Sequence, residues 1–181
     1  MDEGLRGRLL LASPALVDPN FRRSVVLVVA HDDEGAVGLV LNRPTETEVA
    51  EAVPPLADLA GPGALVSLGG PVQPEAVCVL AEWEDAGEAG TIVFEDVGLM
   101  PGDATLEEVL PATRRRRVFA GYAGWSAGQL EIELDEPSWI VADARVEDVF
   151  EEPRDLWAEV LRRKGGPYSF LATMPEDPSL N

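Results

Sequence analysis

The 181-residue sequence contains a single cysteine and a single histidine. Because Cys78 is the only cysteine, no disulfide can form within the chain, and nothing points to an oxidising compartment. Cys78 stands inside the apolar run AVCVL at 76–80. A reactive thiol needs a cationic, accessible setting, so we predict that Cys78 is a buried core residue.

Long apolar runs are also absent. The longest strongly apolar run covers 25–30, and no apolar segment follows a basic start at the N-terminus. A bilayer span needs about 20 apolar residues. We therefore expect a cytoplasmic protein without an export signal or a membrane segment.

Positive charge is scarce, with 14 Lys and Arg against 33 Asp and Glu and a formal net charge of −19. A field of this sign repels phosphate backbones and anionic membranes, so nucleic acid is disfavoured as a partner. The run from Arg114 to Arg117 is an exception. We interpret it as a basic strand edge paired with nearby carboxylates. A direct DNA-binding regulator that uses these arginines is the alternative.

The composition, with 46% hydrophobic and 26% charged residues, is typical of globular proteins, and the length suits one domain covering 1–181. Runs rich in branched apolar residues predict strands, and 31–35 predicts a hairpin turn. Capping boxes open two of the predicted helices. The expected strands are 7–12, 24–30, 36–41, 64–68, 76–80, 91–94, 118–123 and 139–142, and the expected helices are 45–52, 103–110, 146–151 and 153–164.

Strands and helices alternate irregularly, which predicts an α+β fold. Loops are expected at 57–63 and 82–90, and the polar tail 175–181 is expected to fray. Proline 111 is expected to stop the second helix. The segment 128–136 is ambiguous, because its alternation favours a strand whereas its length allows a short helix.

Several motifs occur in an order that resembles the bacterial YqgE/AlgH family, and they cover most of the chain. They are LLLASP at 9–14, DPNFRRSV at 18–25, His31, GAVGLVLNRP at 35–44, GGPV at 69–72, GYAGW at 121–125, GQLE at 128–131 and Trp139. The resemblance implies an α+β fold in which a small closed β-barrel and a forked mixed or antiparallel sheet are surrounded by helices. It also implies that 128–135 is helical. The family has no established biochemical activity, and its link to transcriptional control suggests a regulator.

Two serines suggest a hydrolase as an alternative function. Ser126 lies in GWSAG at 124–128, which matches the nucleophile-elbow pattern, but the only histidine is upstream, which breaks the usual triad order. Ser24 and His31 are seven residues apart on one predicted strand, a separation of roughly 23 Å, far too long for proton transfer. We therefore favour a non-enzymatic domain.

His31 stands beside Asp32, Asp33 and Glu34, but these residues lack the spacing of zinc or calcium sites. We interpret this segment as a solvated acidic turn and predict neither a metal nor a cofactor.

Arginines clustered in an acidic protein suggest an anion site. Glycine N–H groups beside arginines form hollows that bind anions, although the same residues also serve turns and ion pairs. The candidate anion- or ligand-binding residues are Arg22, Arg23, Asn42, Arg43, Gly69 and Gly70.

A polar and aromatic surface formed by Trp125, Gln129 and Glu131 is the candidate site for a protein partner, with core packing of Trp125 as the alternative. The sequence therefore predicts a regulatory or binding domain that acts through a small anion or a protein partner.

Overall fold

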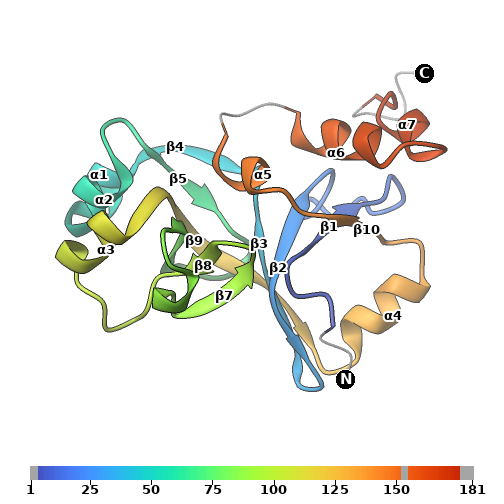
Figure 1. Cartoon of the computed structure of the whole chain (residues 1–181). Helices are drawn as coiled ribbons and strands as arrows, with labels where there is room; N and C mark the ends of the chain where they lie inside the picture. Colours follow the sequence, from blue (N-terminus) through green and yellow to red (C-terminus); the bar gives the residue numbers. More distant parts are fainter. Residues whose placement is uncertain (1–3, 152–154, 176–181) are drawn as a thin grey trace.

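The computed structural model describes residues 4–151 and 155–175 and shows an α+β protein built on one large sheet (Figure 1). The strands are β1 (Arg8–Ala12), β2 (Val25–Asp32), β3 (Gly35–Val40), β4 (Pro44–Glu48), β5 (Leu65–Leu68), β6 (Val72–Trp83), β7 (Thr91–Phe94), β8 (Val97–Leu99), β9 (Thr113–Ser126) and β10 (Trp139–Asp143). The helices are α1 (Val49–Ala52), η1 (Pro54–Leu56), α2 (Ala57–Ala60), η2 (Ala86–Glu88), α3 (Leu106–Ala112), α4 (Gln129–Asp135), α5 (Val146–Phe150), α6 (Leu156–Lys164) and α7 (Tyr168–Leu171).

The sheet follows the order β10-β1-β2-β3-β9-β6-β8-β7, and the pair β4-β5 branches from β9. One edge of β9 pairs with β6. The other edge pairs first with β5, in parallel, and then with β3, antiparallel. The sheet therefore forks at β9, as the resemblance implied.

The closed barrel that the resemblance also implied is wrong for this chain. The sheet runs as an open path whose ends are β10 and β7, and no ladder joins β7 to β1 or β2 among the described residues. Gly7 does lie against β7, since a Cβ at Gly7 would come 2.6 Å from the Val93 carbonyl oxygen. However, the Gly7 N–H donates to the Val28 carbonyl (2.8 Å). The Gly7 N–H is therefore used in the contact with β2 and does not link this segment to β7.

Alternation along β1 builds two cores from one strand. Leu9 and Leu11 pack into a core under α5, α6 and α7, whereas Leu10 packs into a second core under α4. Successive strand residues face opposite sides, so a single apolar run fills both layers. Trp157 lies in the first core, and its indole N–H donates to the Ala12 carbonyl (2.8 Å), which satisfies its polar atom.

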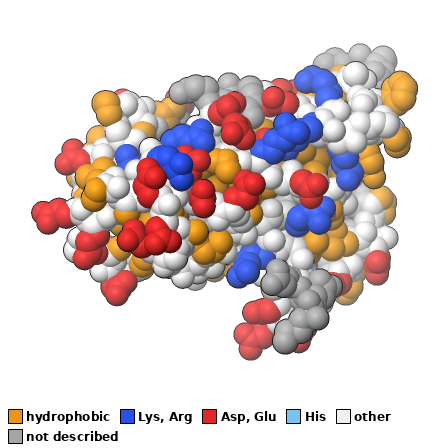
Figure 2. Space-filling model, in the orientation of Figure 1, with side chains coloured by type: hydrophobic (Ala, Val, Ile, Leu, Met, Phe, Trp, Pro, Cys, Tyr) orange, Lys and Arg blue, Asp and Glu red, His pale blue; other side chains and the backbone are white. Residues whose placement is uncertain are grey.

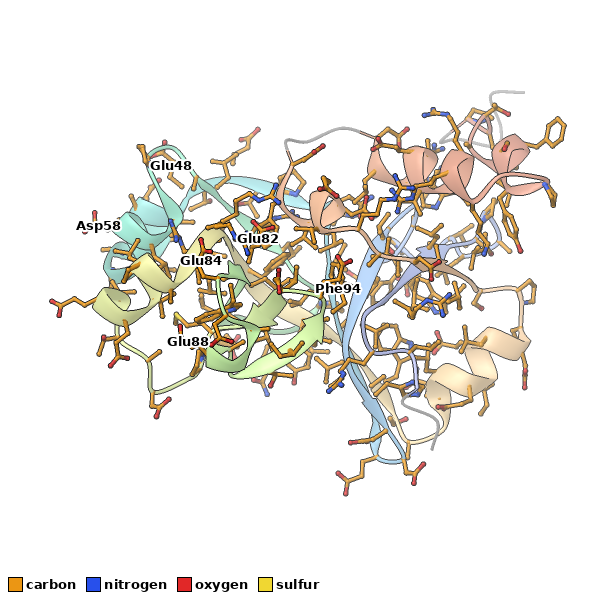
Figure 3. The ribbon with its side chains drawn as sticks, viewed as in Figure 1. Glu48, Asp58, Glu82, Glu84, Glu88 and Phe94 are labelled. Carbon is orange, nitrogen blue, oxygen red and sulfur yellow. The ribbon has the colours of Figure 1, made fainter. Side chains whose placement is uncertain are left out.

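A third core lies at the end of the molecule that carries α1, α2 and α3 (Figure 1). Trp83 is fully buried there, and its indole N–H donates to the Gly98 carbonyl (3.1 Å). The segment 44–112 that forms this end contains 14 Asp and Glu and no Lys or Arg. Acidic side chains are accordingly spread over this half of the visible face, among apolar ones (Figure 2), and Glu48 precedes α1 while Asp58 lies on α2 (Figure 3).

The predicted strands are all present within one or two residues, except that β6 and β9 are much longer than expected. The segment 128–136 contains the helix α4, so the family resemblance was right and the alternation was misleading. The predicted loop at 57–63 contains α2, and β6 and η2 take up most of 82–90. Residues 153–154 of the last predicted helix and 176–181 of the tail lie outside the described residues.

The two capping-box predictions have different outcomes. Thr105 caps α3 as predicted, with Glu108 reciprocating, although Pro111 lies inside the last turn instead of stopping the helix. Thr45 caps nothing, because it lies in β4 and its hydroxyl donates to the Val66 carbonyl (2.7 Å). Pairing of β4 with β5 therefore overrides the local helix signal. In the part of the chain that the structure describes, no helix is long and apolar enough to cross a membrane.

Candidate functional site

A pocket of about 450 Å³ lies between β4, β5 and β9 on one side and α5 with the start of α6 on the other. The residues that line the pocket come from parts of the chain that are far apart in sequence. The pocket is lined by Leu41, Asn42, Pro44, Gly63, Ala64, Leu65, Ser67, Arg116, Arg117, Asp148, Val149, Phe150, Glu151 and Leu156. Its volume lies in the range of small-molecule sites.

Arg117 is one of two arginines in this wall, together with Arg116, and its partners are all neutral. Its Nε and Nη2 donate to the Ser67 hydroxyl oxygen (3.1 and 2.9 Å), its Nη1 donates to the Val149 carbonyl (2.8 Å), and its Nη2 also donates to the Leu41 carbonyl. The guanidinium lies 4.8 Å from the centre of the Phe119 ring. No carboxylate pairs with Arg117 among the described residues, and burial lowers its pKa to about 10.

Two polar hydrogens remain at this point of the wall. A guanidinium carries five N–H groups, and four N–H···O contacts account for all but one, on Nη1. Ser67 is 3% exposed, and its oxygen accepts twice from Arg117, while its own O–H meets no acceptor in the described part of the chain. A buried donor without an acceptor costs about 1–3 kcal/mol.

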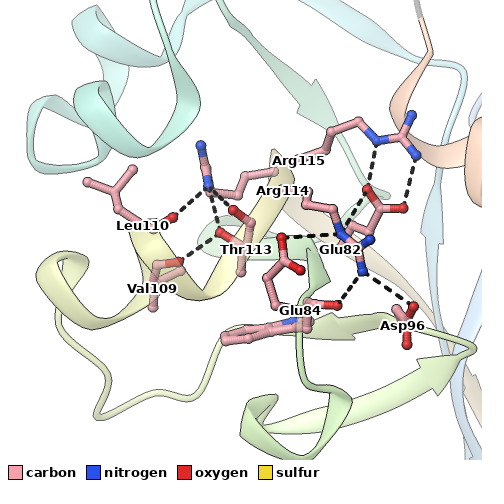
Figure 4. A network of polar contacts seen from close by, with 10 residues as sticks. Glu82, Glu84, Asp96, Val109, Leu110, Thr113, Arg114 and Arg115 are labelled. Carbon is pink, nitrogen blue, oxygen red and sulfur yellow. Dashed lines mark hydrogen bonds and ion pairs between the residues drawn. The ribbon is translucent and has the colours of Figure 1, made fainter.

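Arg114 and Arg115, in contrast, have carboxylate partners (Figure 4). Arg115 forms a bidentate pair with Glu82 (3.0 Å for each contact), which lowers the pKa of that carboxyl and raises the pKa of Arg115. Arg114 lies within 3.5–3.9 Å of the carboxylates of Glu82, Glu84 and Asp96. The predicted pairing with nearby carboxylates is thus confirmed for these two arginines.

Arg116 does not follow that prediction, since it donates to the carbonyls of Leu59 (2.7 Å) and Thr113 (3.1 Å). Arg115, Arg116 and Arg117 pair with β6 on one side, whereas the ladder on the other side of β9 begins at Phe119. The run therefore lies on a part of β9 that is paired on one side only, which agrees with the predicted strand edge. Alternation along that strand sends Arg115 and Arg117 to one face and Arg114 and Arg116 to the other.

The acidic wall residue Asp148 is buried and held away from Arg117. Its carboxylate accepts from both Nη atoms of Arg163 (3.0 and 2.7 Å) and from the Arg145 N–H (2.9 Å). This pair joins α5 to α6. The positive charge of Arg117 is consequently not compensated by Asp148.

Of the six residues predicted as an anion site, only Asn42 lines this pocket. The Asn42 amide accepts from the Val25 N–H (2.8 Å) and donates to the Arg23 carbonyl (2.8 Å). Arg43 donates to the carbonyls of Arg22 and Asn42. The structure thus brings these four residues together around backbone carbonyls.

Arg23 has further contacts of its own. It lies 4.2 Å from the centre of the Trp157 ring and donates to the Met174 carbonyl (3.0 Å), which ties the segment before β2 to α6 and to the residues after α7. It also has a positive φ of 54°, which is uncommon for a residue with a side chain.

Gly69 and Gly70 lie against β9. A Cβ at Gly69 would meet the Gly121 carbonyl oxygen at 2.3 Å, and one at Gly70 would meet the Tyr122 backbone at 2.1 Å. The Gly69 N–H donates to the Ala120 carbonyl (2.8 Å). These glycines allow a close backbone approach, and neither lines the pocket.

The residues predicted as a partner surface divide in two groups. Trp125 is 6% exposed and packs edge-on against Trp139, with ring centres 5.9 Å apart. Gln129 and Glu131 are exposed on α4. The pKa of Glu131 is lowered by its own backbone N–H and by His31, whose Nε2 lies 2.6 Å from Glu131 Oε1.

The two candidate nucleophiles are not paired with His31. Ser24 is fully buried, and its hydroxyl has no hydrogen-bond partner among residues 4–151 and 155–175. The hydroxyl of Ser126 contacts Gln129 Oε1 (3.2 Å). Both ring nitrogens of His31 are occupied, since Nδ1 accepts from the Leu5 N–H (2.9 Å) and Nε2 contacts Glu131.

Two further predictions concern metal binding and Cys78. Among the described residues no group of His, Cys, Asp and Glu has the arrangement to hold a metal. Cys78 is half-buried and packs against the first core, and burial raises the pKa of its thiol to about 11. The prediction of a buried core residue is therefore confirmed in part, because Cys78 packs against the core but is only partly buried.

The sequence analysis did not place Ser67 or Arg117 in an anion site. The buried residues Val118 and Phe119 predicted a strand, and extending that strand to Arg117 would have placed this arginine next to the core. The pocket itself had no local signal, because its walls come from segments up to about a hundred residues apart.

The chain is similar to known proteins over nearly its full length. A family model described as AlgH-like (DUF179) matches residues 9–169. A UPF0301 protein of Streptomyces coelicolor is 47% identical over 98% of this chain and 95% of its own length, and a UPF0301 protein of Thermobifida fusca is 45% identical over 98% and 96%.

Two solved structures have the same fold. The crystal structure of protein DIP2367 from Corynebacterium diphtheriae has a TM-score of 0.87 at 28% identity and covers 95% of this chain and 93% of its own. The solution structure of the AlgH protein from Pseudomonas aeruginosa has a TM-score of 0.72 at 29% identity, with 97% and 96% covered. The chain belongs to the AlgH-like (DUF179) family.

Proposed function

We propose that this protein is a non-enzymatic binding domain that holds a small anionic molecule in the pocket beside Arg117. The observation that carries the proposal is the guanidinium of Arg117, which is surrounded by neutral oxygens at the pocket wall. Burying a charge without a counter-charge is costly, and buried charges are normally paired. A bound anion supplies the missing charge and recovers part of that cost.

The chemistry of the pocket wall supports binding rather than turnover. Ser67 is the one hydroxyl in the wall, and its oxygen already accepts two hydrogen bonds from Arg117, so no base is placed to activate it as a nucleophile in the described residues. The candidate nucleophiles Ser24 and Ser126 do not line the pocket. The arginine run is engaged by carboxylates and carbonyls, which weighs against a role in contacting DNA phosphates.

A thermal-shift screen tests the proposal, because a ligand that binds the native state raises the unfolding midpoint by mass action. The probes are small carboxylates, inorganic phosphate and nucleotides. We expect at least one anion to raise the midpoint by a few degrees, and we expect Arg117→Met to abolish that shift.

Two variants make the screen decisive. Arg114→Ala, on the same strand but outside the pocket, keeps the shift; Arg23→Ala tests the cluster predicted from sequence. A shift lost in Arg23→Ala and kept in Arg117→Met places the anion at the other cluster and contradicts the proposal. Absence of any shift with every anion contradicts it as well and directs the search to a protein partner.

A further inference from the structure

At the polar side of the pocket, Arg117 and Ser67 together offer two hydrogens and one positive charge. The hydrogens are the remaining N–H of Arg117 Nη1 and the O–H of Ser67, whose own oxygen lies 2.9 Å from Arg117 Nη2. A carboxylate has one negative charge spread over two acceptor oxygens, and arginine pairs well with it. The donors and the charge at this wall therefore match one carboxylate.

The rest of the wall is largely apolar. Leu41, Val149 and Leu156 are buried, and Phe150 and Leu65 complete the same surface. The side chains of these five residues have no group that can hydrogen-bond a second polar group of a ligand. Apolar area removed from water stabilises a complex by about 25 cal/mol per Å². The wall thus fits a hydrocarbon body attached to the carboxylate.

Other anions fit the pocket less well. Phosphate and nucleotides carry two or more negative charges and at least three acceptor oxygens, which exceed the one charge of Arg117 and the two hydrogens of Arg117 and Ser67; Arg116 lines the same pocket, but its Nε and Nη1 donate to the carbonyls of Leu59 and Thr113. The carboxylates of Asp148 and Glu151 also line the wall, and the whole molecule has a net charge of −19. Like charges at this range disfavour a multiply charged ligand.

We propose that the ligand is an apolar monocarboxylate, such as a medium-chain fatty acid or an aromatic acid, with its carboxylate on Arg117 and Ser67. This inference rests on the proposed function, since it names the chemical class for the same pocket. The pocket volume of about 450 Å³ lies toward the lower end of the range for small-molecule sites, which fits a ligand of this size.

Isothermal titration calorimetry with matched probes tests this class. Octanoate carries both features, octanol lacks the charge, acetate lacks the body, and octyl phosphate replaces the carboxylate by a dianion. We expect octanoate to bind at least tenfold more tightly than each of the other three. Arg117→Met reduces octanoate affinity at least tenfold, and Ser67→Ala reduces it about fivefold. Arg114→Ala leaves it unchanged.

Substitutions at the pocket mouth give an independent readout if Arg117→Met fails to fold. Leu65 lines the pocket and is 43% exposed, so the fold tolerates a charge there. Leu65→Lys tightens octanoate binding about threefold and Leu65→Glu weakens it about threefold. Equal affinities for these two variants contradict an anion in this pocket.

The outcomes separate the ligand class from the binding function. Tighter binding of octyl phosphate than of octanoate, weakened in Leu65→Glu, overturns the monocarboxylate class and leaves an anion-binding domain. Equal binding of octanol and octanoate overturns the role of the charge. No binding of any probe overturns both proposals.

Discussion

At the scale of single residues, the run from Arg114 to Arg117 shows how one residue type acquires different roles from its surroundings. Arg115 is paired with Glu82, whereas Arg117 is buried against neutral oxygens. Both carry the same charge in the unfolded chain. The difference arises because each position along β9 places its side chain beside a different element, so that Arg115 meets Glu82 of β6 whereas Arg117 lines the pocket.

Glu82 provides a test of the ion pairs on β9. Its pKa is lowered, first by the hydrogen bond from Arg115, so its contribution to stability is present above the ordinary carboxyl pKa and is lost as pH falls through the lowered value in the folded state. We expect Glu82→Gln to reduce the free energy of unfolding by about 1–2 kcal/mol at pH 7, since its side chain is 13% exposed. Urea unfolding at several pH values measures this.

A matched control is Glu84→Gln, which removes an exposed partner of Arg114 and should change the free energy of unfolding by less than about 0.5 kcal/mol. The difference between wild type and Glu82→Gln should shrink below about pH 4, as the carboxyl becomes protonated. A difference that stays constant down to pH 3 would contradict the ion-pair interpretation.

Cys78 gives a second prediction at this scale. With its pKa raised to about 11, the thiolate is rare at pH 8, so iodoacetamide should react with the native protein roughly a hundredfold more slowly than with the urea-unfolded chain. Mass spectrometry of timed samples measures both rates. Similar rates in the two states would show that Cys78 is accessible and ionised in the fold.

At the scale of elements, the fork at β9 depends on close backbone approach. Gly121 has a φ of 74°, and a Cβ there would come 2.4 Å from the Gly70 carbonyl oxygen. The strand changes partners at this point, since Ala120 pairs with β5 and Ala123 pairs with β3. A side chain at Gly121 would therefore push the two branches apart.

We expect Gly121→Ala to destabilise the fold by roughly 2–4 kcal/mol, through both the positive φ and the steric clash. Gly102→Ala is the matched control, because Gly102 has nothing within 4 Å of an added Cβ, and its change should be within about 0.5 kcal/mol. Chemical denaturation of both variants decides the question. A neutral Gly121→Ala would mean that the branches are not held this closely.

The helices show where local signals suffice. The box at Thr105 and Glu108 caps α3 because no strand competes for that segment. The same pattern at Thr45 and Glu48 falls on β4, which pairs with β5. Likewise, alternating residues in α4 suggested a strand, but Ile132 is 61% exposed on a helix whose buried side rests on Leu130. Tertiary contacts decide between local alternatives of similar energy.

At the scale of the whole molecule, charge is unevenly distributed. The segment 44–112 carries 14 of the 19 net negative charges and forms one end of the molecule, over which acidic side chains are spread (Figure 2). Like charges gathered at one end destabilise the compact state, and salt screens them within about 10 Å at 0.1 M.

We therefore expect the unfolding midpoint to rise by several degrees between about 0.01 and 0.3 M NaCl, as measured by differential scanning calorimetry. Salt also weakens the ion pairs on β9, but these are few in comparison with the exposed acids. A midpoint that falls with salt would show that ion pairing dominates over repulsion.

The sequence by itself determined the α+β class, the positions of all strands except β4 and β8, the packing of Cys78 against the core, and the family. These depend on local patterns and ordered motifs. The tertiary structure alone decided that the sheet stays open, that β9 carries the fork, and that Ser67, Arg117 and α5 meet at one pocket. These features depend on contacts between segments far apart in the chain, where the choice of partner is set by packing and hydrogen bonding that no local pattern encodes.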